Sequence, residues 1–116
     1  LMTPQEDDPT DLLFQGDFKS GSSALTLPNA MRYTRLIFAG RSGSATSTSG
    51  VTQYRINAVN TIETSTLTTS AANKTLTYGG STFTFSLAYS GSNIIVRYVS
   101  DTTSGAGGIV AIYGHM

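Results

Sequence analysis

Alternation of apolar and polar residues with a period of two is the clearest pattern in the chain, and residues 81–89 show it best. Phe83, Phe85, Leu87 and Tyr89 share one parity, while the other parity holds three hydroxyl residues and an alanine. Successive side chains of a β-strand point to opposite faces of a sheet, so this alternation predicts a strand with one buried face.

The same reasoning predicts eight further strands, of which two rest on alternation and six on β-branched, aromatic or aliphatic content. They span residues 12–18, 24–27, 33–39, 51–59, 61–69, 74–78, 93–99 and 109–113. The Thr-rich segment 61–69 is expected at an edge. The last two segments carry apolar residues on both parities, so we expect the core to cover one face of each and a second subunit the other.

Glycine- and serine-rich turns separate these segments. Gly79 and Gly80 predict a two-residue hairpin, since glycine accepts the positive φ that such turns require. Residues 29–32 are the one predicted helical turn, and residues 40–50 are a Ser/Thr/Gly surface loop. About nine short strands with this spacing predict an all-β protein, an antiparallel β-sandwich of jelly-roll-like type.

The composition excludes several kinds of chemistry. The 116 residues form one domain's worth of sequence and include no Cys and one His. A disulfide framework, a thiol nucleophile, a Cys-based zinc site and a multi-His metal site are therefore excluded, and we expect no metal and no cofactor. The longest apolar runs are three or four residues, far short of the roughly 20 that a membrane helix needs, so no membrane insertion is expected.

Charge divides the chain into two parts. Five of the seven acidic residues lie in the first 17 positions, whereas the rest of the chain has seven basic and two acidic residues. We expect residues 1–11 to be an acidic linker from an upstream segment and residues 12–116 to be the folded domain. The basic balance is compatible with acidic partners, but its arginines are scattered and do not form the stripe that nucleic-acid binding requires.

Catalytic chemistry has little support. A nucleophile triad would have to use His115, two residues from the end, and no GxSxG motif is present. A glycosidase needs two carboxylates across a cleft, but Glu63 lies in the predicted Thr-rich strand and Asp101 opens a Gly-rich turn. The sequence therefore predicts a protein that is not an enzyme.

Binding is better supplied, because six Tyr and five Phe offer flat faces for sugar rings or protein surfaces. Most of these aromatics lie on the core parity, so we take as candidate ligand-binding residues those at strand ends beside loops. They are Arg41, Tyr89 and Asp101. The charged pair would fix the orientation of a ligand. The alternative is that both are solvated turn residues.

The two ends of the folded part resemble one family. Residues 12–40 (LLFQGDFKSGSSALTLPNAMRYTRLIFAG) are similar to the opening of C-terminal head domains of tailed-bacteriophage tail fibres and related tail needles and adhesins. There an apolar strand with a glycine is followed by a Gly/Ser turn, a short "TL" strand and a strand that begins with Tyr. The closing residues 107–116 (GGIVAIYGHM) resemble the last strand of those heads, which often finish near Ile-Tyr-Gly. The final His115-Met116 departs from the basic or aliphatic ending that is usual.

The resemblance implies a homotrimeric β-sandwich head at the distal end of a virion fibre or needle. Such a head attaches the virion to a host surface polysaccharide or an outer-membrane protein, with no catalytic residues to transfer. The loops at residues 40–50, 70–73 and 101–108 are the candidate contact surfaces. Two other functions stay open: a structural virion component such as a needle knob or capsid decoration, and a carbohydrate-binding module of a larger enzyme.

Overall fold

The fold is that of a computed structural model, which describes residues 10–43, 46–48, 51–53, 55–103 and 107–116, with only the backbone for the two short segments. Most of the predicted linker, at residues 1–9, lies outside this part of the chain. Residues 44–45 and 49–50 of the predicted 40–50 loop and residues 104–106 of the predicted 101–108 loop also lie outside it.

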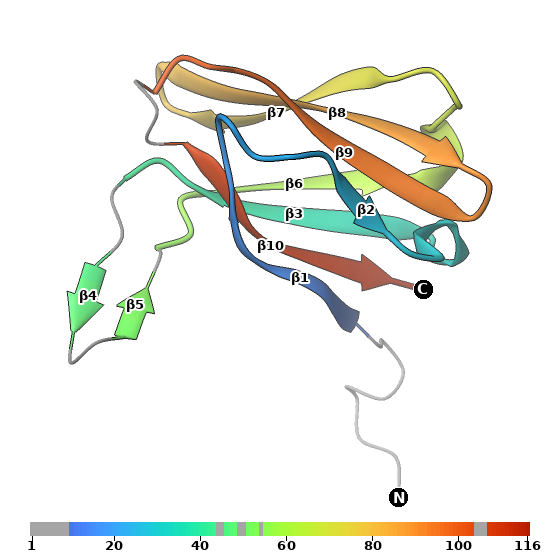
Figure 1. Cartoon of the computed structure of the whole chain (residues 1–116), viewed down its shortest axis with the longest axis horizontal. Coiled ribbons are helices and arrows are strands. Elements are labelled where there is room, and N and C mark those ends of the chain that lie inside the picture. The colour runs from blue at the N-terminus through green and yellow to red at the C-terminus, as the bar shows by residue number, and fades with distance from the viewer. Residues whose placement is uncertain (1–9, 44–45, 49–50, 54, 104–106) are drawn as a thin grey trace, which may run out of the picture.

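Two four-stranded antiparallel sheets pack face to face as a sandwich, as the sequence predicts (Figure 1). The first sheet has the order β1 (Thr10–Phe18), β10 (Gly108–His115), β3 (Arg35–Arg41) and β6 (Ala58–Glu63). The second sheet has the order β2 (Leu25–Leu27), β9 (Asn93–Asp101), β8 (Ser81–Ser90) and β7 (Ala72–Tyr78). A hairpin of β4 (Thr46–Thr48) and β5 (Val51–Gln53) projects from the first sheet.

The chain ends close the sandwich. The first two strands pair with the last two, β1 with β10 in the first sheet and β2 with β9 in the second. Both connections, from β1 to β2 and from β9 to β10, therefore cross between the sheets side by side, which is the jelly-roll-like part of the topology. Next to these closing pairs, β3 lies between β10 and β6 in the first sheet, and β8 lies between β9 and β7 in the second.

The core lies between the sheets and is built on the alternation that the sequence shows. Phe83, Phe85 and Leu87 of β8 are completely buried, and from the other sheet Phe38 places its ring 4.9 Å from that of Phe85. Aromatic rings at this separation stabilise a core beyond the area they bury. Truncating a side chain such as Phe38 to Ala typically costs about 3–5 kcal/mol.

Two predicted turns are confirmed. The β7–β8 hairpin turns at Gly79, whose φ is +65°, with Tyr78 paired directly to Ser81. The predicted helical turn is a short 3-10 helix, η2 (Ala30–Arg32), preceded by Asn29 in the left-handed region.

The prediction of one strand over residues 51–59 is wrong. β5 ends at Gln53 and β6 begins only at Ala58. Asn57 forms the corner between them: its backbone N–H donates to the Gly40 carbonyl over 2.8 Å, and its side-chain oxygen accepts from the Ser42 N–H over 3.0 Å. These bonds close the base of the excursion formed by β4 and β5, so the apparent alternation across residues 55–58 does not belong to a single strand.

The predicted strand at residues 61–69 is also wrong beyond Glu63, although β6 is an edge strand as expected. The chain turns into a 3-10 helix, η3 (Thr64–Thr66), because the buried Thr64 hydroxyl donates to the Tyr33 carbonyl over 2.6 Å and the Thr64 N–H donates to the Thr34 carbonyl over 3.0 Å. A threonine that bonds to a neighbouring backbone in this way ends the strand and sends the chain to the other sheet.

We expected a second subunit on the outer faces of the last two strands, but one chain alone leaves little of β10 exposed. Val110 and Ala111 are 6% and 5% exposed in one chain, and Ile112 is fully buried. β10 is the second strand of its sheet, with neighbours on both sides. The outer face of β9 is more open, since Ile95 is half-buried and Val99 is 42% exposed.

Candidate functional site

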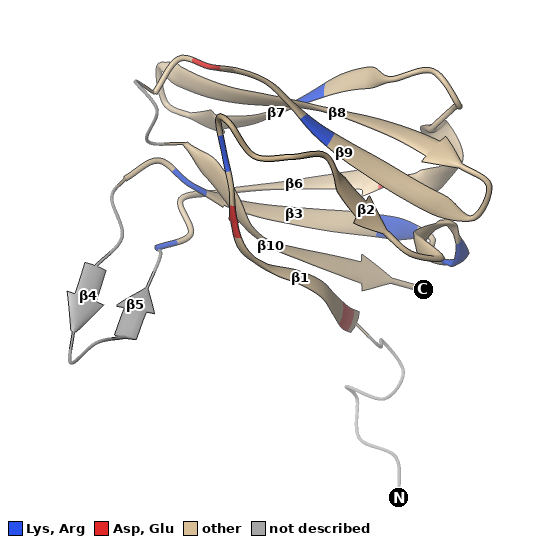
Figure 2. Ribbon diagram, in the orientation of Figure 1, with Lys and Arg blue, Asp and Glu red and all other residues tan. Residues whose placement is uncertain are grey.

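The outer face of the second sheet is a polar surface. The side chains of β8 that alternate with the core residues point outward. They are Thr82, Thr84, Ser86, Ala88 and Ser90, and all but Ala88 carry a hydroxyl. Charge is sparse on this sheet, as Figure 2 shows: its strands hold two bases, Lys74 and Arg97, and one acid, Asp101.

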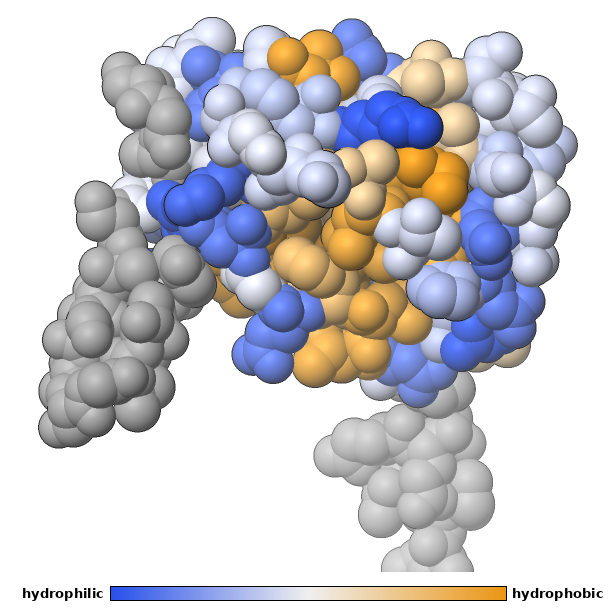
Figure 3. Space-filling view, viewed as in Figure 1, coloured by the Kyte–Doolittle hydropathy of each residue, from blue (hydrophilic) through white to orange (hydrophobic). Residues whose placement is uncertain are grey.

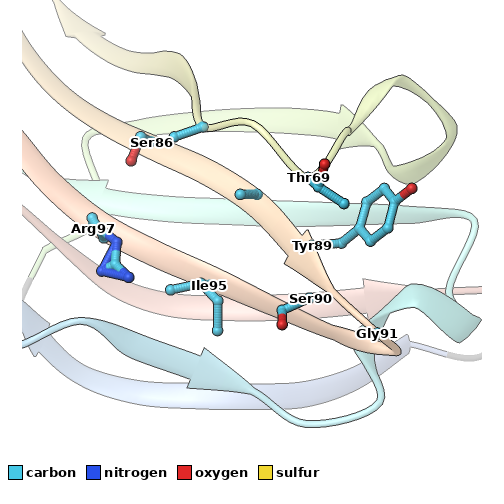
Figure 4. Close-up of a pocket in the computed structure, with 9 residues that line it drawn as sticks. Thr69, Ser86, Tyr89, Ser90, Gly91, Ile95 and Arg97 are labelled. Atoms are coloured by element: carbon cyan, nitrogen blue, oxygen red, sulfur yellow. The ribbon is translucent and has the colours of Figure 1, made fainter.

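A groove of about 580 Å³ lies on this face, and we call it the β8–β9 groove. Its volume falls in the range of sites that take small ligands. Figure 4 shows its lining side chains on β8, on β9 and on the segment before β7. The lining residues are Thr69, Ala71, Ser86, Ala88, Tyr89, Ser90, Gly91, Ile95 and Arg97.

Strand register builds the floor of the groove. Ser86 lies directly opposite Arg97, and Ala88 directly opposite Ile95. Residues paired in this way place their Cβ atoms roughly 5 Å apart on one face. Ser86 is only 6% exposed, whereas Arg97 is exposed, so the hydroxyl lies deep and the guanidinium lies at the surface.

A short segment after η3 forms one wall. The backbone N–H of Tyr89 donates to the Thr68 carbonyl over 3.0 Å, which holds this segment against the end of β8. The Ser70 N–H donates to the Thr68 hydroxyl over 3.1 Å and fixes the local turn. Figure 4 shows the Tyr89 ring beside Thr69, at the opposite end of the groove from Arg97. The groove thus runs from Arg97 to Tyr89, whose side chain shares the core parity of β8 and packs partly against the core.

Tyr89 is the one sequence-predicted ligand residue that lines the groove. Its ring is half-buried and packs partly against the core. Ala71, from the predicted contact loop 70–73, also lines the groove.

Arg41 has a structural environment instead. Its Nε and Nη2 donate to the two carboxylate oxygens of Asp17 over 2.9 and 2.7 Å, and its Nη1 donates to the Gly43 carbonyl over 2.6 Å. The side chains of Arg41 and Asp17 are 7% and 12% exposed. This pair links β3 to β1 across β10 at Gly108, where an added Cβ would lie 2.6 Å from Asp17 Oδ1.

Asp101 caps a turn at the same end of the sandwich. It accepts hydrogen bonds from the backbone N–H and hydroxyl of Thr103 and, over 3.2 Å, from the N–H of Gly107. In the register of β9 it lies opposite Phe83, six residues along β8 from Tyr89, or roughly 20 Å. The structure therefore brings Asp101 and Arg41 to one end and leaves Tyr89 at the other.

Tyr78 lies near this charged end. Burial, and next the negative charge of Asp101, raise the pKa of Tyr78 to about 12, against a smaller opposite effect of Arg41. The Tyr78 hydroxyl is buried and has no hydrogen-bond partner within the part of the chain that the structure describes.

The outer face of the first sheet is apolar over two rows of residues that register places side by side. One row joins Leu12, Tyr113 and Ile37 and ends at the polar Thr61, and the next runs from the polar Gln15 through the buried Ala111 and Ala39 to Val59. Leu12 is 52% and Val59 59% exposed. Figure 3 shows hydrophobic surface near the edge strands β1 and β2, where the core is less completely covered.

Sequence reasoning missed Arg97 and Ser86. The signal was present in β9, because Arg97 is flanked by the apolar Val96 and Tyr98 and must take the outward parity when Val96 takes the core. Ser86 sits likewise between Phe85 and Leu87. What the sequence does not contain is the pairing that places these two residues opposite each other.

Among the residues that the structure describes, no group of three or more His, Asp or Glu side chains is arranged to hold a metal ion. In the same residues no helix is long and apolar enough to cross a membrane. Comparison of the chain with protein-family models, with curated proteins and with solved structures gave no match.

Proposed function

We propose that this chain is the receptor-binding head of a bacteriophage tail fibre, a domain without catalytic activity that attaches the virion to the host cell surface. The observation that carries the proposal is the β8–β9 groove, which combines hydroxyls, one aromatic ring and one exposed arginine on a rigid sheet. Few but well-placed polar groups beside an aromatic surface suit a saccharide or an exposed protein loop.

The resemblance at the two chain ends adds support. The parts of it that carry over as strands, residues 12–18 and 107–114, are about 90 positions apart in sequence and yet lie largely in β1 and β10, which pair along most of their length. A motif shared with the family at both ends is then one structural unit, the closing strand pair of the first sheet.

We further propose that the head is a homotrimer that associates through the outer face of the first sheet. This face carries an apolar band next to the polar row of His115, Arg35 and Glu63, and two large side chains of the band on the edge strands, Leu12 and Val59, are more than half exposed. Burying apolar area stabilises association by about 25 cal/mol per Å², before ordering costs are subtracted. The groove lies on the opposite face and would stay free in such a trimer.

A carbohydrate-binding module of an enzyme is the second candidate, favoured by the same groove with Tyr89 at one end. The two functions differ in the first sheet: the module is expected to be a monomer, the fibre head a trimer. A structural virion component, the third, would bind purified virions and no cells.

The test is adsorption of the labelled domain to a panel of bacterial strains, together with its mass by light scattering at micromolar concentration. We expect a trimer that adsorbs to at least one strain, with adsorption reduced about tenfold by Tyr89→Ala and largely kept by Tyr89→Phe. Circular dichroism of both variants checks that they fold. A monomer that adsorbs to no strain contradicts the proposal.

A further inference from the structure

We propose that the β8–β9 groove selects saccharides that carry a carboxylate, and that Arg97 is the residue that recognises it. The ligand class is a polysaccharide containing uronic acid or a similar carboxylated sugar. This proposal takes the groove as the receptor site and therefore rests on the proposed function, but it adds the chemistry of the receptor.

The first argument is the charge of Arg97. Three ion pairs connect the residues that the structure describes, and they use Lys19, Arg32 and Arg41 with Asp11 and Asp17. Arg97 belongs to none of them, and no Asp or Glu lines the groove.

The acid of the second sheet does not compensate this charge. Asp101 lies at the other end of β9 from the hairpin that closes the groove, and it is held by Thr103 and Gly107. The groove therefore presents one positive charge with no carboxylate of its own, a setting that attracts an anionic ligand.

The second argument is geometry. A guanidinium is planar and presents parallel N–H donors that match the two oxygens of a carboxylate. Arg97 is exposed and lies opposite Ser86, so its donors are available to a ligand lying in the groove. The hydroxyls of Ser86 and Ser90 on the floor and of Thr69 on the wall both donate and accept, as sugar hydroxyls require.

The third argument separates a carboxylate from a phosphate monoester. A phosphate monoester carries a charge of about −1.5 to −2 at neutral pH, whereas a carboxylate carries one. The groove offers one cation, which matches a single negative charge. Ile95, two residues from Arg97 on the same face of β9, offers apolar surface to a neighbouring sugar ring, and Tyr89 lines the end of the groove beyond it.

The experiment uses one hexasaccharide of alternating glucuronate and N-acetylglucosamine, the same hexasaccharide after reduction of its carboxyl groups to neutral hexose, and a phosphorylated neutral hexasaccharide. Calorimetric titration of the whole chain should give binding of the acidic hexasaccharide about tenfold or more tighter than of the reduced form, since a charge-assisted bidentate contact is lost. The preference should weaken as salt rises.

Arg97→Gln should abolish this preference, so that the variant binds the acidic and the reduced hexasaccharide with equal affinity. Arg97→Lys should keep a part of it, because it keeps the charge and loses the planar fork. Arg55→Gln is the matched control: Arg55 is also exposed and lies outside the groove, so removing it should leave the preference unchanged.

Four outcomes overturn the inference: equal affinity of the unmodified chain for the acidic and reduced forms, no binding of either, tighter binding of the phosphorylated form, or a preference that survives Arg97→Gln. The inference and the proposed function fail separately. A chain that adsorbs to cells but shows any of these outcomes loses the carboxylate recognition and keeps the attachment role, whereas a chain that adsorbs to no strain loses the attachment role.

Discussion

Two outward-facing arginines distinguish the two faces of the sandwich. Arg41 ends an inner strand of the first sheet and Arg97 lies in an inner strand of the second. Arg41 faces Asp17 across a glycine and is buried with it, while Arg97 faces Ser86 and is exposed. The same residue type is a structural clamp in one case and an available cation in the other, and the difference lies in the residue that pairing places opposite.

The outer faces of the two sheets differ in the kind of contact that they suit. The first sheet presents aliphatic rows and a closed ion pair, which suits association with another protein surface. The second presents hydroxyls, a groove and an arginine outside the ion pairs of the described residues, which suits a polar ligand. Substitutions on the two faces should therefore separate stability and assembly from binding.

The largest expected effect is on the closed ion pair. Arg41→Met leaves the largely buried Asp17 carboxylate with only the exposed Lys19, whose Nζ lies 3.5 Å away, so we expect the free energy of unfolding to fall by about 3 kcal/mol, measured by chemical denaturation. The double variant Arg41→Met with Asp17→Leu removes both charges and should recover most of this loss. Arg97→Gln on the other face should change stability by less than about 0.5 kcal/mol. Equal losses for the two arginines would remove the distinction between the faces.

The next effect concerns assembly. Leu12→Lys combined with Val59→Lys places two charges on exposed positions of the first sheet, so the fold should stay intact while the charges oppose burial at a shared surface. We expect the mass in light scattering to fall to that of one chain. Val99→Lys, on the more exposed part of β9, is the control and should keep the trimer. Dissociation by Val99→Lys alone would place the interface on the second sheet.

Much of the fold could be predicted from the sequence, because a strand with one buried face alternates apolar and polar residues. β8 is the clearest case, with every core residue on one parity, and the Gly79 turn follows from backbone geometry alone. The errors at residues 55–57 and 64–69 have a common cause. There a polar side chain, Asn57 or Thr64, bonds to a distant backbone segment and ends the strand, and its partner lies 15 to 31 residues away.

The candidate site was less accessible for the same reason. A strand-end position and a residue type do not distinguish Arg41 from Arg97, because the deciding neighbours, Asp17 and Ser86, come from other strands. Tyr89 was found because its position at a strand end beside a Gly turn is visible locally. Local position thus picked out one residue that lines the groove, Tyr89, and two that do not, Arg41 and Asp101, whereas Ser86 and Arg97 depend on register and were not predicted.

The smallest expected effect tests how closed the Arg41 end of the sandwich is. The Tyr78 hydroxyl is buried there without a hydrogen-bond partner within the described residues, so Tyr78→Phe should raise the free energy of unfolding at pH 7 by about 1 kcal/mol. Denaturation titrations of the variant beside the unmodified chain measure this difference directly. A variant less stable than the unmodified chain would mean that the hydroxyl has a partner and that this end is open to water.

Ionisation of Tyr78 also makes the stability of the unmodified chain depend on pH in the alkaline range. Below pH 10 the tyrosine is protonated in both the folded and the unfolded chain and contributes nothing to the slope. Between about pH 10 and the folded pKa of about 12, the unfolded chain releases the Tyr78 proton and the folded chain retains it, so the unfolded state binds fewer protons and stability falls as pH rises. Tyr78→Phe removes this part of the fall, about 1 kcal/mol once the partial exposure of the ring is allowed for. The advantage of the variant should therefore widen from pH 10 to pH 12, and parallel stability curves over that range would show that Tyr78 ionises as freely in the folded chain as in the unfolded one.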